Sequence, residues 1–189
     1  MGHMMILLIL GWLLFVGVHL MIGVRSGRQK LENRFGRWGL RVFVALGSIV
    51  GLAMMAQGYA VARFYPGWMP LSWGHELAAV LMPVASILLI AAYLPSNIKR
   101  FTAHPMLWAV VLWAVAHLMV RGDWASLVLF GGLGLYALVA MGLAWMRGQR
   151  PRTGPQRVWA DGVAIGGGLA VYVGLLIVHP ILFGVSVFQ

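Results

Sequence analysis

The sequence predicts an all-α integral membrane protein, a single domain over residues 4–189 that forms a bundle of about six transmembrane helices. Apolar residues make up 61% of the 189 residues, and the mean hydropathy is +0.88. Several apolar runs approach or exceed the roughly 17 to 25 residues that a spanning helix needs. Nowhere do apolar and polar residues alternate as they do in the strands of a membrane β-barrel. Met1 to His3 are interpreted as a remnant of an expression tag, so the natural chain is expected to begin at Met4 or Met5.

The first two predicted spans are separated by the most basic segment of the chain. The first span covers about Met5 to Val24 and contains His19. Arg25 to Arg37 follows as a predicted loop with five Lys or Arg and one Glu. The second span covers about Trp38 to Arg63 and contains two glycines at the GxxxG spacing that permits close helix contact. The Pro- and Trp-rich stretch after it, Tyr65 to Trp73, is expected to lie at the membrane interface.

The remaining spans are marked by helix-start and turn signals. The third begins near Ser72 or Gly74 and ends before Pro95. The fourth begins at the His104-Pro105 pair, because proline suits the first turn of a helix, where its missing N–H would be unpaired anyway.

A tight turn over Arg121 to Asp123 should make the fourth and fifth spans antiparallel neighbours. The fifth span is predicted over about Trp124 to Met146 and the sixth over about Val158 to Phe183. The loop between them, Arg147 to Arg157, holds four arginines.

The distribution of charge predicts the orientation. The first, third and fifth loops carry five, two and four Lys or Arg, and the other two carry at most one each. The positive-inside rule then places the odd loops in the cytoplasm and both termini outside, which means the periplasm for a protein of a bacterial inner membrane. The basic residues lie in the loops between spans, where they set the orientation of the protein, so the net charge of +10 does not indicate a nucleic-acid partner. The absence of cysteine excludes disulfides, iron–sulfur clusters and thiolate ligation.

Five histidines remain once the tag is set aside, and each is a candidate because ionisable residues within spans usually face the bundle interior. His19 and His117 are the deepest in their spans. His75 and His104 lie near helix starts, and His179 precedes a proline. For these three a structural role, such as helix capping or contact with water, is favoured over binding. On the predicted topology, His75, His117 and His179 lie toward the outside, and His19 and His104 toward the cytoplasm.

A pair of histidines on facing helices suggests a b-type haem, since bundles hold this cofactor with one imidazole on each side of the iron. Trp113 lies one turn before His117 and shares its helix face. Arg41 is a candidate to meet a haem propionate. Hydrolytic catalysis is disfavoured, because a triad or a glycosidase pair needs carboxylates, and Glu76 and Asp123 lie at span ends while Asp161 lies near the other side of the membrane.

Five short motifs are spread over most of the chain: Leu14-Phe15-Val16-Gly17-Val18-His19, Ala91-Ala92-Tyr93-Leu94-Pro95, His104-Pro105-Met106-Leu107, Trp113-Ala114-Val115-Ala116-His117 and Gly122-Asp123. Together they resemble the NnrU family over nearly the whole chain. NnrU proteins are bacterial membrane proteins associated with nitric oxide and nitrite reduction in denitrifiers. The resemblance implies a redox component of nitrogen-oxide metabolism, or a non-catalytic partner of a nitrogen-oxide reductase or another redox membrane protein.

The NnrU family is in turn similar to the 15-cis-zeta-carotene isomerase, a membrane protein that uses haem b to isomerise a cis double bond. The shared features are Gly74-His75-Glu76-Leu77, the His104-Pro105 pair and the Trp-x-x-Ala-His stretch ending in His117. This resemblance implies haem b ligated by His19 and His117. Ala114 stands where the isomerase has a cysteine. Because of this resemblance, haem-dependent isomerisation of a carotenoid or another hydrophobic polyene is the alternative function.

Depth in the membrane leaves the second haem ligand open. The predicted spans place His19 and His117 at depths that differ by about 16 Å in a core about 30 Å thick. Two histidines on one iron would have Cα atoms about 12 Å apart, if the metal–nitrogen bonds resemble those of zinc. His75 is therefore kept as the alternative partner of His117, and His179 is compatible as well. A methyltransferase is disfavoured because Ala103 replaces the arginine of its Arg-His-Pro motif, and no inverted repeat suggests a transporter.

Overall fold

The structure, a computed structural model, describes residues 2–185 and 187 and the side chains from Met5 onward; Met1, the first residue of the predicted tag remnant, lies outside this part. The all-α prediction is confirmed. The spanning helices are α1 (Gly2–Gly23), α2 (Arg25–Ala60), α3 (Gly74–Ala91), α4 (Pro105–Val120), the continuous segment α5–η2–α6 (Trp124–Ser126, Leu127–Gly131 and Gly132–Met146) and α7 (Val158–Phe183). Five of them are long and apolar enough to cross a membrane, and α4 is a shorter apolar helix.

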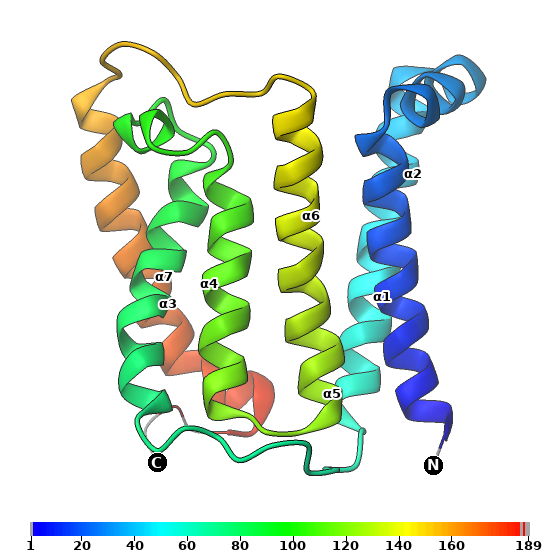
Figure 1. The fold of residues 1–189 in the computed structure, drawn as a ribbon, viewed down its shortest axis with the longest axis vertical. Helices are drawn as coiled ribbons and strands as arrows, with labels where there is room; N and C mark the ends of the chain where they lie inside the picture. The colour runs from blue at the N-terminus through cyan, green and yellow to red at the C-terminus, as the bar shows by residue number, and fades with distance from the viewer. Residues whose placement is uncertain (1, 186, 188–189) are drawn as a thin grey trace.

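The helices stand side by side in one bundle (Figure 1). α1 packs on α2, α3 packs on both α4 and α7, and α4 packs on α6. α6 and η2 also contact α1, so they join the α1–α2 hairpin to the rest of the bundle. The start of α1 and the end of α7 lie at the same end of the bundle, as an even number of spans requires.

The segment Arg25 to Arg37 is helical, so its prediction as a loop was wrong. It forms the first part of α2 and lies across the end of α1 (Figure 1). Its residues are mostly good helix formers, and Glu32 lies within 4 Å of Arg28 and Arg37. Gly36, at φ 69° and ψ 174°, then turns the chain into the spanning part of α2. A positive φ of this kind favours glycine, since it has no Cβ.

Small residues let α1 and α2 approach closely, as the glycine spacing in the second predicted span indicated. A Cβ on Gly11 would lie 2.7 Å from the backbone nitrogen of Met55, and one on Gly58 would lie 2.6 Å from that of Leu8. Leu8 and Met55 are both fully buried in this interface. Because lipid tails are as apolar as leucine, such close packing is a main source of helix association in a bilayer.

The predicted turn before the fifth span is confirmed and is held by Asp123. Its carboxylate accepts hydrogen bonds from the backbone N–H and the hydroxyl of Ser126, at 2.9 and 2.7 Å, and caps the start of α5. Arg121 lies 3.4 Å from the same carboxylate. The interfacial stretch after α2 folds over this turn, where the Gly67 N–H donates to the Gly122 carbonyl at 2.7 Å.

The basic residues gather at one end of the bundle. Of the 14 Lys and Arg, all but Arg63 and Arg121 lie in α2 before its midpoint or in the segments that join α3 to α4 and α6 to α7. Figure 1 shows these segments at the end opposite to the chain termini. This end is called the basic end below, and the other end is called the terminal end.

Candidate functional site

His19 lies near the basic end, on the last turn but one of α1. Its Nδ1–H donates to the Phe15 carbonyl at 2.8 Å, and its ring stacks on the Phe15 ring with centroids 4.3 Å apart. The Tyr136 ring from α6 meets it edge-on at 6.0 Å. With Nδ1 held by a carbonyl, Nε2 carries the lone pair and is the atom available to a metal or to a hydrogen-bond donor.

His117 has the same local arrangement near the other end of the bundle. Its Nδ1–H donates to the Trp113 carbonyl at 2.8 Å, and the two rings lie 5.1 Å apart, as their shared helix face predicted. The imidazole also stacks on Phe130 at 4.5 Å, and the Phe130 ring lies 4.8 Å from that of Trp113, so the three rings form one cluster. Phe130 belongs to the π-helical turn η2, and such turns are frequent at functional sites.

The structure does not bring His19 and His117 into one cavity. His19 is four residues before the end of α1 at the basic end, and His117 is three residues before the end of α4 at the terminal end (Figure 1). His117 does not line the pocket that contains His19. The separation in depth that the sequence suggested is therefore present in the bundle.

Two other histidines share the terminal end with His117. His75 is exposed in the first turn of α3, which begins against the end of α4 because Gly74 packs on the Met119 carbonyl. His179 lies near the end of α7, and its Nδ1–H donates to the Val185 carbonyl at 2.9 Å. Among the described side chains, from Met5 onward, no group of three or more histidines or carboxylates is arranged to hold a metal ion.

Arg41, the predicted propionate partner, is exposed on α2. Its guanidinium lies over the Trp38 ring, 5.1 Å from the centroid. Trp38 is itself 76% exposed, so the pair is placed to meet lipid headgroups at the membrane interface. Arg41 does not line the pocket beside His19.

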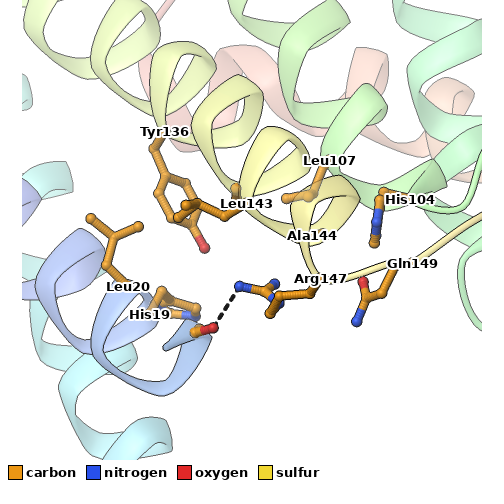
Figure 2. A pocket seen from close by; sticks show the side chains of 11 residues that line it. His19, Leu20, His104, Leu107, Tyr136, Leu143, Ala144, Arg147 and Gln149 are labelled. Atoms are coloured by element: carbon orange, nitrogen blue, oxygen red, sulfur yellow. Dashed lines mark hydrogen bonds between the residues drawn. The ribbon is translucent and has the colours of Figure 1, made fainter. Parts of the chain in front are cut away.

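A pocket of about 180 Å³ lies at the basic end between α1, α6 and the start of α4. Figure 2 shows His19 and Tyr136 on one side of it and His104 and Gln149 on the other, with Arg147 between them. Arg147 donates from Nη1 to the Gly23 carbonyl at 2.5 Å and thereby joins the end of α6 to the end of α1. The remaining wall is apolar, formed mainly by leucines 20, 107 and 143.

His104 contributes a buried ring nitrogen to this pocket. Its Nε2 is buried and makes no hydrogen bond within the described residues, an arrangement that costs about 1–3 kcal/mol when nothing compensates it. Burial, and then the nearby charge of Arg147, lower the pKa of His104 below its usual value, so the imidazole is neutral at pH 7. Its side chain does not cap α4, although the residue stands at the N-cap position. The sequence allowed His104 to cap the helix, but the structure shows no such hydrogen bond.

Sequence reasoning missed most of this pocket. Arg147 was interpreted only as an orientation signal, and Tyr136 was one aromatic residue among many on an apolar helix. The shared depth of His19 and His104 was visible in the predicted topology and was the one signal that could have joined them. Asp161 was also missed: its carboxylate accepts from the backbone and side-chain amides of Asn97, at 2.6 and 2.7 Å, and ties α7 to the α3–α4 connection.

These positions allow a test of how well a haem would fit. Sites for drug-sized ligands measure about 300–1,000 Å³, so the 180 Å³ pocket beside His19 is too small for a macrocycle as it stands. His19 and His117 do not fit one iron in this arrangement. Taken by itself, His117 is suited to ligate a metal. Its Nδ1 is anchored, and its Nε2 makes no hydrogen bond in the described part of the chain. His75 and His179 are the imidazoles at the same depth.

The fold and the histidines define a class: a polytopic helical membrane protein with imidazoles at both ends of an apolar bundle. No protein with a curated description and no solved structure shows detectable similarity to the chain. The family is nevertheless clear. The chain belongs to the NnrU family, whose profile, described as NnrU protein, matches residues 7–187.

Proposed function

We propose that this NnrU protein binds haem b with His117 as an iron ligand and acts as a redox component of nitrogen-oxide metabolism in a bacterial inner membrane, with both termini in the periplasm. One observation carries the haem proposal: the His117 imidazole is held from behind by the Trp113 carbonyl at 2.8 Å and against Phe130 at 4.5 Å, with Nε2 left for a metal. Ligating histidines generally have their other ring nitrogen fixed in this way. Bound haem would supply an iron that takes up and releases one electron.

The second ligand is expected from the same end of the bundle. His179 lies near the end of α7, at the same end of the bundle as the end of α4, and His75 starts the helix that packs on the end of α4. The resemblance to the carotene isomerase favours His19 instead, and the matching Nδ1 anchor of His19 supports that choice. For His19 to share an iron with His117, the helices would have to slide along one another, because the two residues lie near opposite ends of the bundle.

The direct test is the absorption spectrum of the purified full-length protein before and after reduction with dithionite. Two imidazole ligands should give a red protein with the sharp bands of low-spin haem on reduction. A colourless protein, after expression with added haem precursor, would overturn the proposal. That result would favour the remaining alternative, a non-catalytic partner of a nitrogen-oxide reductase.

Isomerisation of a carotenoid or another polyene is the second activity that the family resemblance suggests. Ala114, at the position of the isomerase cysteine, is buried beneath Gly134 and offers no group to exchange with a haem ligand. We therefore place redox function ahead of isomerisation.

A further inference from the structure

The pocket at the basic end does not contain His117, the proposed haem ligand, yet it combines features of a binding site. It contains two imidazoles, a phenol, a guanidinium and an amide around an apolar floor. The His104 Nε2 is buried and unpartnered among the described residues, and none of the hydrogen bonds found there uses the Tyr136 hydroxyl. Since buried polar groups are normally satisfied, a ligand is a physical explanation for the free His104 nitrogen.

The volume of the pocket limits the ligand to a small ring. A cavity of about 150 Å³ in an apolar core is enough to bind benzene. At about 180 Å³, this pocket can hold one six-membered ring with small substituents. The leucine wall suits the faces of such a ring, and the position at the end of α1 and α6 suits a molecule that arrives through the bilayer.

The polar groups favour a ring that carries oxygen atoms on opposite sides. Tyr136 and His19 lie on one side of the pocket, and His104 and Gln149 lie on the other (Figure 2). The Tyr136 hydroxyl can donate to a carbonyl oxygen, and the lone pair on His19 Nε2 can accept from a hydroxyl. Because the pKa of His104 is lowered, its neutral ring can likewise donate or accept at Nε2 according to its tautomer. The set can therefore satisfy either carbonyl or hydroxyl oxygens.

We infer that this pocket binds the single-ring head of a membrane-soluble quinone or quinol, with Tyr136 and His104 as its hydrogen-bonding partners on opposite sides. Arg147 keeps its charge and its other N–H groups after donating to the Gly23 carbonyl, so an anionic headgroup is the competing ligand that the experiment must separate. The Tyr136 phenol, the Gln149 amide and the leucine wall favour the uncharged ring.

Binding can be measured by calorimetry with decylubiquinone and the full-length protein in phosphatidylcholine nanodiscs. Tyr136→Phe and His104→Leu should each weaken binding about 3- to 10-fold, because each removes one hydrogen bond to the ligand. Leu107→Trp should abolish binding by filling the pocket. Tyr172→Phe removes the hydroxyl of a half-buried tyrosine on α7, away from the pocket, and should bind like wild type. Tyr136→Phe keeps the ring, so the bundle should fold normally.

Three results would overturn the inference. One is the absence of saturable decylubiquinone binding by the wild type. Another is equal binding by the Tyr136→Phe and Tyr172→Phe variants, since the quinone would then occupy another place. The third is that phosphatidic acid in the nanodiscs displaces the quinone from the wild type but not from Arg147→Gln. The pocket would then be a site for anionic lipid. Heats of binding are independent of the haem spectrum, so failure of either proposal can be recognised separately.

Discussion

Asp123 shows how a single carboxylate can hold a membrane bundle together. It is 2% exposed and caps α5, while the Ser126 hydroxyl that it accepts from lies 2.9 Å from the Tyr59 hydroxyl of α2. The carboxylate thus connects the fourth and fifth spans to the second. The sequence placed Asp123 in a turn, and the structure gives it a structural role there.

Asp123→Ala should destabilise the protein by about 2 kcal/mol, because it removes an N-cap and leaves Ser126 and Arg121 without their partner. Asp123→Asn should reduce the stability by about half as much as Asp123→Ala, because its amide oxygen can still accept from the Ser126 N–H. Unfolding of the purified variants in detergent measures both changes. Glu32→Ala is the control, because its ion pairs are exposed and worth about 0–1 kcal/mol. Equal losses in Asp123→Ala and Glu32→Ala would contradict the role given to Asp123.

His104 should make stability depend on pH. Its pKa is lowered in the folded protein, so the unfolded chain takes up the proton first as the pH falls. The stability from this group is full above the unfolded pKa of about 6.5 and is lost as the pH falls from there toward the lowered value. The melting temperature should fall more between about pH 7.5 and pH 5.5 for wild type than for His104→Gln. Parallel decreases would show that His104 is not the group responsible.

At the scale of elements, the spacing of glycines decides which helices touch. Gly11 and Gly17 lie on the same helix, but only Gly11 meets the backbone of α2. α1 is apolar all around, so its sequence alone does not show which face packs against a neighbour. The structure separates contact glycines from those that face open space.

Gly11→Ala should destabilise the protein by about 1–3 kcal/mol, because its Cβ would lie 2.7 Å from the Met55 nitrogen and 2.8 Å from the Gly51 oxygen, and both are backbone atoms. Gly17→Ala is the matched control. A Cβ there has no neighbour within 4 Å in the described residues, so the change should be neutral or stabilising by up to about 1 kcal/mol. Thermal unfolding in detergent compares the two. Loss of stability in both variants alike would show that α1 does not pack on α2 through Gly11.

At the scale of the whole molecule, local signals predicted the spans well. The His-Pro start of α4 and the limits of the fifth and sixth predicted spans agree with the structure. The charge of residues 25–37 was mistaken for a loop signal, because basic residues are also good helix formers. The pocket could not be predicted, since Arg147 and Tyr136 reach His19 only after α6 packs beside α1. That contact follows from tertiary packing of apolar helices and leaves no periodic pattern in the sequence.

The orientation of the bundle can be tested with single cysteines, since the chain has none. Ser26 and Thr153 are exposed at the basic end, and Ser72 is exposed at the terminal end. In intact cells, an impermeant thiol reagent should label Ser72→Cys and spare Ser26→Cys and Thr153→Cys. The reverse pattern would invert the orientation. Ser96 is fully buried, so a cysteine there would not report the side of the membrane.

The central claim is that His117 ligates haem, and the reduced absorption spectrum of alanine variants at the histidines tests it most directly. His117→Ala should lose the low-spin bands of wild type. If the second ligand comes from the terminal end, either His75→Ala or His179→Ala should lose them as well, while His19→Ala should keep them. Loss in His19→Ala, with the other two unchanged, would restore the pair that the isomerase resemblance implies. A His117→Ala protein that keeps the wild-type low-spin spectrum would contradict the account.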